Sequence, residues 1–502
     1  MSAFSNLLKD VLNAKSVDKL QLSGAMGIDR ALLYRYLNDQ SFPDRSFLSD
    51  LRAELLLTPY EYRDLLRAYE MTRLGETVFE NRRIVSSIIQ SIYRQSEKLI
   101  GLNNTVSTAG FPVKDIVTLS NSDSVYWAVQ QILQDPRTQN VMLTLQPDQE
   151  FVHHSVTSLL VSQARLRPLH IEHIVRFQSK SLDSHATYNL KIFSHILPAL
   201  FACNYYTDSQ YFVYYYYNNQ VSVDERAMEL YPHALITSWC VCLFSFHYNS
   251  AVIIQDPAVA QLYRNNFLSI RDKTSCFLKE AVTADGESTL MQRLTHEPYF
   301  ECIFKTHPSV SLAGNEKHYA KYYQSPNNTD TTLVDNLIHR YHLRMQAMNS
   351  EFYKGRRDFF TFSGLRRLVY TGRFSNSPDP NIPAMDHEDI RCFIENYLQK
   401  LKTLPHFEAH LVKEDTPGML SGDFGIYIIN NNSMIIEKAR RDTVPKRHLI
   451  EVTEKSIVNA FLEYLQNGIE FEEIICSNAQ TIALLESLLK VDLDIDRLAP
   501  IL

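Results

Sequence analysis

A basic stretch between positions 354 and 373 contains the densest group of side chains with evident chemistry. Arginine binds carboxylates and phosphates through two parallel hydrogen bonds, which fix direction as well as charge. Aromatic residues interleave with the basic ones, and the candidate ligand-binding residues are Arg356, Arg357, Arg366 and Arg367. The stretch is predicted either to contact an anionic effector or a DNA backbone, or to form a solvated basic face.

A second group of candidate residues follows Asp29. The Asp29 carboxylate is suited to accept a free backbone N–H at the start of a helix predicted over positions 30–38. Leu33 and Tyr36 are expected to face inward, which leaves on the outer side and at the helix end Arg30, Ala31, Tyr34, Arg35 and Asn38. A helix of this kind placed in the major groove of DNA would present the first three to base edges and the last two to phosphates.

The residues around this helix, LSGAMGIDRALLYRYLNDQSFP (22–43), resemble the helix-turn-helix of the XRE family of Cro- and repressor-like regulators. The family has a helix, a Gly-Val/Ile turn, a capped recognition helix and an Asn-Gly-x-x-x-Pro exit. The matching residues are Ala25, Gly27-Ile28, Asp29, Asn38 and Pro43, with Asp39 in place of the second glycine. The resemblance covers residues 3–71 and implies binding to double-stranded operator DNA as a homodimer.

The charge of this head leaves an alternative open. Residues 1–75 contain ten Lys or Arg and ten Asp or Glu. Much of the affinity for DNA comes from neutralising phosphates, so a neutral head is expected to bind weakly as a monomer. Either dimerisation supplies the missing contacts, or the head is a five-helix protein-binding module with the same fold.

The rest of the chain lacks the patterns of common enzymes. It has no Walker A loop, GxGxxG, GxSxG or HExxH pattern. The order of a strand pair, Asn249, a strand at 251–255, Asp256-Pro257 and a helix resembles the closing portion of phospholipase D-like domains. Those enzymes need His-x-Lys, which is absent, so the resemblance implies a scaffold without catalysis. We therefore predict no enzyme activity, no cofactor and no metal site.

Composition limits the class of protein. Hydrophobic residues make up 45% and charged residues 21%, as in globular domains, and the net charge of -7 argues against coating nucleic acid along the whole surface. The seven cysteines include no Cys-x-x-Cys pair and are predicted to be reduced thiols of a cytoplasmic protein. The longest apolar run, residues 236–246, is too short to span a membrane, and no membrane partner is expected.

The elements that position these residues change along the chain. Five short helices are predicted in residues 1–75, followed by a long amphipathic helix at 78–99 whose apolar stripe is either a core face or a dimer seam. A linker is predicted at 101–110. The body then has an α/β pattern, with strands predicted at 141–146, 169–177, 211–217, 234–246, 251–255, 407–412, 425–430 and 433–439.

These patterns predict a multidomain α+β protein, an all-α helix-turn-helix head followed by α/β sensor-like domains. The predicted divisions are a DNA-binding domain at 1–75, a connector helix and linker at 76–105, an α/β middle domain at 106–285 and a mixed α/β region at 286–502. Residues 254–263 and 452–461, 198 positions apart, each run from a strand end through an acidic residue into an amphipathic helix. This echo arises either from two units that share a fold or by chance.

The sequence thus predicts a DNA-binding transcriptional regulator whose body senses an unknown ligand or protein and mediates dimerisation. Two other classes remain open. One is an enzyme that acts on nucleic acid or nucleotides and is targeted by the helix-turn-helix head. The other is a defence-associated adaptor that binds proteins.

Overall fold

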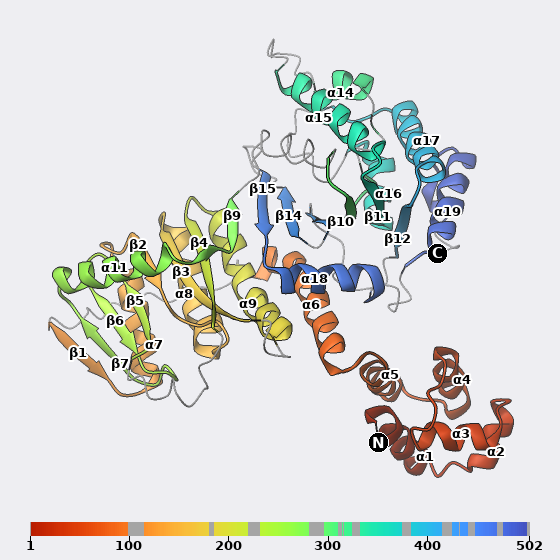
Figure 1. Ribbon diagram of the computed structural model, residues 1–502, viewed down its shortest axis with the longest axis horizontal. Coiled ribbons are helices and arrows are strands. Elements are labelled where there is room, and N and C mark those ends of the chain that lie inside the picture. The colour runs from red at the N-terminus through yellow and green to blue at the C-terminus, as the bar shows by residue number, and fades with distance from the viewer. Residues whose placement is uncertain are drawn as a thin grey trace. The chain divides into compact units, whose positions relative to one another are not determined.

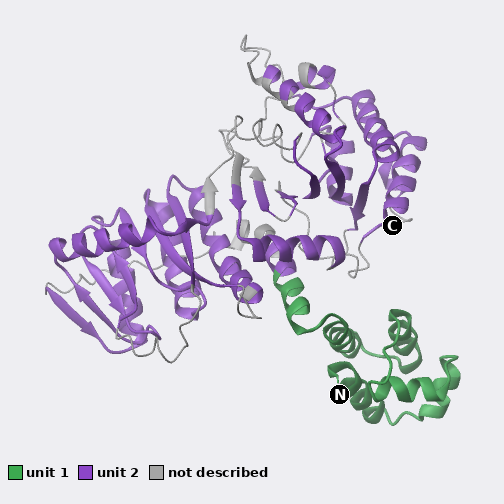
Figure 2. Ribbon diagram, in the orientation of Figure 1, with its two compact units in different colours: residues 1–84 green, residues 85–502 purple. Residues whose placement is uncertain are grey.

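A helical N-terminal region is followed by two mixed sheets, so the chain is a multidomain α+β protein, as predicted (Figure 1). The computed structural model describes residues 2–98, 115–179, 185–218, 231–280, 296–309, 314, 316–323, 332–373, 383–413, 424–430, 432–439, 447–468 and 475–498. The chain divides into two compact units, residues 1–84 and 85–502 (Figure 2). The predicted linker at 101–110 lies outside the described residues.

The first unit is built from short helices around one apolar cluster. The helices are α1 (Ala3–Ala14), α2 (Lys19–Ala25), α3 (Arg30–Leu37), α4 (Arg45–Leu55), α5 (Pro59–Leu74) and the first part of α6 (Glu76–Lys98). Leu8, Leu33, Leu48, Leu51 and Leu65 have no solvent exposure and lie in this cluster. The helical spacing of the apolar residues therefore positions α3 against the remaining helices of the head.

Helix α6 is continuous across the boundary between the two units. The sequence predicted a connector helix at 78–99, and the structure has it at Glu76–Lys98. Ile84, Val85, Ile88 and Ile89 are buried within the single chain. Over these residues the apolar stripe is a core face, and a dimer seam on this helix stays a prediction.

The first sheet of the second unit has the order β1-β7-β6-β5-β2-β3-β4-β8. Its strands are β1 (Ile116–Leu119), β2 (Asn140–Leu143), β3 (His170–Gln178), β4 (Gln210–Asn218), β5 (His233–Ile236), β6 (Val241–Phe244), β7 (Ala251–Ile254) and β8 (Ser275–Cys276). The helices of this part are α7 (Ser122–Gln134), α8 (Thr157–Leu166) with a preceding π-helical turn, α9 (His185–Tyr206) and α11 (Pro257–Arg271).

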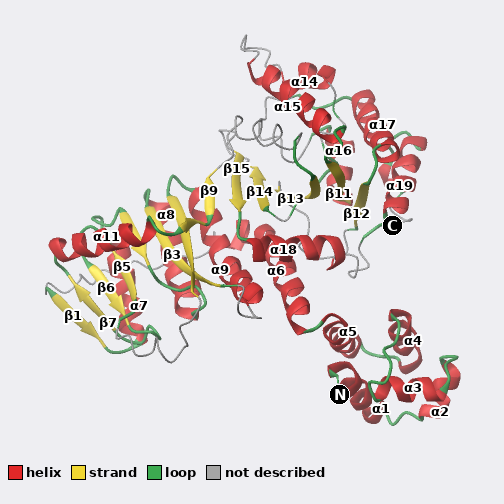
Figure 3. Ribbon diagram, viewed as in Figure 1, coloured by secondary structure: helices red, strands yellow, loops and turns green. Residues whose placement is uncertain are grey.

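The second sheet has the order β12-β11-β10-β13-β14-β15-β9 (Figure 3). Its strands are β9 (Leu278–Glu280), β10 (Tyr299–Lys305), β11 (Tyr353–Thr361), β12 (Phe407–Val412), β13 (Phe424–Ile429), β14 (Ser433–Ala439) and β15 (Arg447–Val452). The helices of this part are α14 (Glu316–Tyr323), α15 (Thr332–Met348), α16 (Phe362–Thr371), α17 (His387–Thr403), α18 (Lys455–Glu463) and α19 (Asn478–Lys490).

The two sheets repeat one topology. Strands β7-β6-β5-β2-β3-β4 of the first sheet correspond in order to β15-β14-β13-β10-β11-β12 of the second. The directions also agree, since in each set the last three strands are parallel and the other pairs are antiparallel. The sequence echo marks the same joint in both, because Asp256 caps α11 and Glu454 caps α18. This confirms that the two α/β repeats, both within the second compact unit, share a topology.

Polar groups join the two repeats at the start of α18. The buried Glu454 carboxylate accepts hydrogen bonds from Tyr217 Oη at 2.8 Å and Ser456 Oγ at 2.5 Å. Asn189 Nδ2 on α9 donates to the same Ser456 Oγ at 3.1 Å. Glu454, Ser456 and Asn189 are buried and each needs its partner, so the contact fixes α18 against α9, and Tyr217 extends it to β4.

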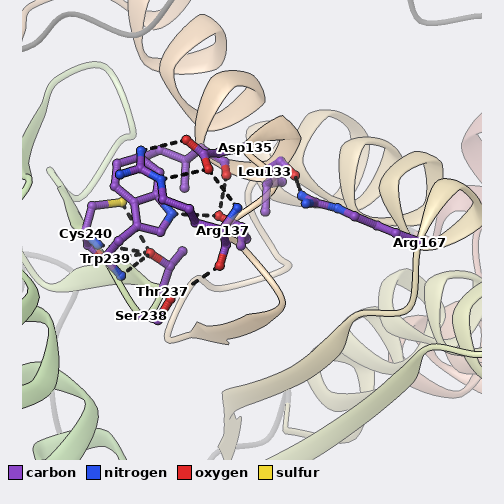
Figure 4. Close-up of polar contacts among 10 residues, drawn as sticks. Leu133, Asp135, Arg137, Arg167, Thr237, Ser238, Trp239 and Cys240 are labelled. Atoms are coloured by element: carbon purple, nitrogen blue, oxygen red, sulfur yellow. Dashed lines mark hydrogen bonds and ion pairs between the residues drawn. The ribbon is translucent and has the colours of Figure 1, made fainter.

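The segment predicted as one strand at 234–246 is a hairpin of β5 and β6. The turn between them, residues 237–240, is held by Trp239, whose Nε1 donates to Thr138 Oγ1 at 3.0 Å. The Arg137 guanidinium lies 3.9 Å from the centroid of the Trp239 ring and pairs with Asp135 at 2.7 Å (Figure 4). The prediction of a single strand did not take account of Thr237 and Ser238, two polar residues that interrupt an otherwise apolar run.

Several elements of the second sheet were missed by the sequence analysis. Residues 283–335 were predicted to be irregular, yet β10 and α14 lie in their described part. The basic stretch at 354–373 is not one continuous face, because it divides into strand β11 and helix α16.

Substitution of Trp239 tests how much its buried ring stabilises the protein. Trp239 is buried, so Trp239→Ala is expected to lower the free energy of unfolding by about 3–5 kcal/mol. Arg137→Ala is the matched control, because its side chain is 59% exposed and its removal should cost about 1 kcal/mol or less. The midpoint of urea unfolding, followed by circular dichroism, measures both. Equal losses would show that the buried Trp239 ring contributes no more to stability than the exposed Arg137 cation.

Candidate functional site

Two capped helices, α2 and α3, are joined by a short turn in the head. Asp18 Oδ1 accepts the Leu20 N–H at 2.8 Å at the start of α2, and Asp29 Oδ1 accepts the Ala31 N–H at 2.8 Å at the start of α3. Between the helices Gly27 has φ of +64°, a left-handed conformation that glycine adopts without steric cost. The Gly27 turn and the Asp29 cap, both read from the sequence, together set where α3 begins.

Helix α3 is packed through one side only. Leu33 and Leu37 are buried, and the Tyr36 ring packs edge-on against Phe47 with centroids 5.2 Å apart. The five candidate residues are all exposed, and they are Arg30, Ala31, Tyr34, Arg35 and Asn38. The structure therefore places the predicted DNA-contacting residues together on the solvent side and at the C-terminal end of α3.

Tyr34 lies between two cations. The Arg30 guanidinium is 5.4 Å and the Lys19 ammonium 5.6 Å from the centroid of the Tyr34 ring. A hydrogen bond from Arg30, together with the charges of Arg30 and Lys19, lowers the pKa of the Tyr34 hydroxyl. Lys19 belongs to α2, so this exposed cluster combines groups from both helices of the motif, and the sequence analysis did not include Lys19.

The exit from α3 explains the departure from the usual glycine. Asp39 has φ of +56°, which lies in the left-handed region. Its carboxylate accepts hydrogen bonds from Ser2 N and Ser2 Oγ, each at 2.5 Å, and these bonds lower the pKa of Asp39. Since Ser2 is the N-cap of α1, an aspartate here ties the end of α3 to the start of α1, which glycine cannot do.

The four candidate arginines of the basic stretch do not converge on one surface. Arg356 is fully buried, whereas Arg357, the next residue of β11, pairs with the half-exposed Glu408 at 2.8 Å. Successive side chains of a strand point to opposite faces, so these two cannot hold the same ligand. Arg366 pairs with Asp496 at 3.0 Å, and Arg367 is exposed on α16.

Arg356 is already paired inside the protein. Its Nε lies 2.6 Å from Asp358 Oδ1 and its Nη1 3.1 Å from Glu301 Oε2. Arg344 Nη2 approaches Glu301 at 2.7 Å, and Tyr397 Oη donates to Asp358 at 3.0 Å. Burial alone would raise the pKa of Glu301, but the two arginines outweigh it and lower that pKa. Arg356 therefore has a structural partner set, and no free face toward an effector.

A polar cluster that the sequence analysis missed lies where β2 and β3 end. It contains Gln146, Asp148, Arg176, Tyr188 and His195, which come from two strand ends and from α9. No sequence motif joins these residues, and only the parallel pairing of β2 with β3 brings them together.

Comparison with known proteins does not assign a family. No protein-family model and no curated protein matches the chain. Among solved structures, TrmBL2, an archaeal chromatin protein solved for its mode of DNA binding, matches at 13% identity over 41% of this chain and 72% of its own, with a TM-score of 0.22. A mutant of yeast tyrosyl-DNA phosphodiesterase matches at 11% identity over 68% of this chain and 91% of its own, with a TM-score of 0.20. Likenesses this slight identify neither fold nor function.

No helix in the described part of the chain is long and apolar enough to cross a membrane. Within the same residues no group of three or more His, Cys, Asp or Glu side chains is arranged to hold a metal ion.

The two neighbouring arginines of β11 should differ sharply on substitution. Arg356→Ala leaves the buried Asp358 carboxylate without its cation and Glu301 with Arg344 alone, and is expected to cost about 3–5 kcal/mol of unfolding free energy. Arg357→Ala removes a pair whose side chains are 31% and 40% exposed, so a loss of about 1 kcal/mol or less is expected. Urea unfolding of both variants tests this. An Arg356→Ala protein as stable as the wild type would contradict the structural role of this arginine.

Proposed function

We propose that the chain is a sequence-specific, DNA-binding transcriptional regulator, whose body senses a ligand or partner and mediates dimerisation. The observation that carries the proposal is the exposed side of α3, a capped helix fixed by Leu33 and Leu37 that presents Arg30 and Tyr34 from its first turns. Helices of this kind enter the major groove with their N-terminal residues toward the base edges.

Each candidate residue has a role in this proposal. Arg30 offers paired donors to guanine, and the Tyr34 ring offers an apolar contact to a thymine methyl group. Ala31 lies between them and permits close approach to the base pairs. Arg35 and Asn38, farther along α3, contact phosphates and set the register of the helix in the groove.

The proposal assigns no catalytic step to the body. None of the nucleophile, metal or phosphate-loop patterns of the enzymes considered occurs in the sequence. Arg356, which is fully buried, is engaged by Asp358 and Glu301 and serves the fold of the second sheet.

Substitutions on α3 test the reading surface. Arg30→Ala and Tyr34→Ala should each reduce selective binding by about 1–3 kcal/mol per lost base contact, without unfolding the head. Arg67→Ala is the control, because Arg67 is exposed on α5 and its loss removes one positive charge but no group of α3. Selection of bound DNA from a random library, followed by titration, measures affinity for the selected and for unrelated DNA. Unchanged selectivity in both α3 variants would contradict the proposed reading face.

Assembly is the second test. A head with equal numbers of acidic and basic residues is expected to need two copies for tight binding. Sedimentation of the full chain should show a dimer or a larger assembly, and footprints should cover two half-sites separated by whole turns of DNA. A monomer that binds a single half-site tightly would be incompatible with this arrangement.

A further inference from the structure

The carboxyl ends of β2 and β3 gather polar side chains at one edge of the first sheet (β2, β3 and α9 in Figure 1). In sheets with parallel strands, ligands commonly bind beyond the carboxyl ends of the strands. Strands β2, β3 and β4 are parallel to one another, so their carboxyl ends lie at the same edge of the sheet. Asp148 follows β2, and Arg176 lies near the end of β3.

Two opposite charges flank one hydroxyl group at this edge. Arg176 Nη2 donates to Tyr188 Oη at 3.3 Å, and Tyr188 Oη donates to Asp148 Oδ2 at 3.0 Å. Burial and the neighbouring carboxylate raise the pKa of Tyr188 to about 12, so the hydroxyl keeps its proton at neutral pH. The guanidinium and the carboxylate are thus held near each other by a neutral group.

Both charged groups keep unused hydrogen-bonding capacity. Among the described residues no carboxylate pairs with the Arg176 guanidinium. Asp148 Oδ1 is buried and has no hydrogen-bond partner. A buried carboxylate oxygen without a donor costs free energy, which a ligand that supplies a donor would recover.

The surrounding groups fix the pair. The side-chain Oε1 of the buried Gln146 accepts a hydrogen bond from the backbone N–H of Arg176 at 3.0 Å. The backbone N–H of Gln146 donates to Tyr248 Oη at 2.9 Å. His195 Nδ1 lies 2.7 Å from the Pro147 carbonyl oxygen, and burial lowers the pKa of His195. Arg176, Asp148 and Tyr188 are themselves partly exposed at this edge.

We propose that this edge binds a small zwitterion, an α-amino acid, with its carboxylate on Arg176 and its ammonium group on Asp148 Oδ1. A simple anion would lie beside the Asp148 carboxylate without supplying it a donor, and a simple cation would meet Arg176. A zwitterion matches both charges at once and gives each the partner that it lacks. The inference rests on the proposed function, since it names the effector class of the sensing body.

Thermal unfolding and calorimetry of the full chain test this proposal. Each of the twenty amino acids is added in turn at millimolar concentration, and at least one is expected to raise Tm by about 2 °C or more. The best ligand is then compared with its amide, which lacks the carboxylate, and with its N-acetyl form, which lacks the ammonium group. Both derivatives should fail to bind. These comparisons use the wild-type protein and do not depend on whether a variant folds.

Substitutions at Arg176 and Asp148 test the two proposed ligand contacts separately. Arg176→Gln and Asp148→Asn are each expected to weaken binding about tenfold or more, because each removes a charge-assisted hydrogen bond. Arg264→Gln on α11 changes a partly exposed arginine outside the cluster and should leave Kd unchanged. Circular dichroism of each variant confirms the fold.

Three results would overturn the proposal: no amino acid binds, the N-acetyl form binds as well as its parent, or inorganic phosphate binds in place of the amino acids. Operator binding, measured on the same protein, separates this proposal from the proposed function. If no ligand binds but DNA selectivity is intact, only the zwitterion site is contradicted. If DNA selectivity is absent but the ligand binds, the proposed regulator function is contradicted and the zwitterion site stands.

Discussion

A fully buried guanidinium must keep carboxylate partners, and Arg356 imposes this requirement on the second sheet. Asp358 lies on the same strand, but Glu301 lies on β10, directly opposite Arg356 in the register of β10 with β11. A slip of one residue would turn one partner to the other face and leave a charge unpaired. Arg344 from α15 and Tyr397 from α17 contact the same carboxylates, so the network also fixes two helices over the sheet.

The first repeat solves the same packing problem without charge. Ile254 and Val452 hold equivalent positions in the two repeats. When this equivalence is carried from strand to strand through the residue pairs of each sheet, Glu301 is equivalent to Val141 and Arg356 to Ile171. Both of these apolar residues are fully buried. The first sheet thus keeps an apolar pair where the second has an ion pair, and its unpaired charges lie instead at the carboxyl edge, beside Tyr188. The duplicated topology has therefore been used for stability in one repeat, whereas in the other it leaves polar groups available.

Local patterns predicted the head well, and long-range pairing limited prediction of the body. The Gly27 turn and the Asp29 cap fix α3 within a few residues, so helical periodicity sufficed there. Strand β11 was missed because its sequence, YKGRRDFFT, is polar at buried positions, and alternation of apolar and polar residues was the available signal. The buried partner of Arg356 on β10 is 55 residues away, too far for any local pattern to reveal. The cluster around Tyr188 depends in the same way on strand pairing.

The head has equal numbers of acidic and basic residues, but the two kinds of charge make different contacts. Asp18, Asp29 and Asp39 each accept backbone N–H groups, and Asp18 and Asp29 do so at helix N-termini, where a negative charge is stabilised. The basic residues Lys19 and Arg30 instead surround the exposed Tyr34. In the proposed complex with DNA, Asp18 and Asp29 would repel phosphates near the start of α3, so this surface would draw less of its affinity from the DNA backbone than a basic domain would. Base contacts would then contribute a larger share, which would favour selectivity over tight general binding and make a paired head advantageous.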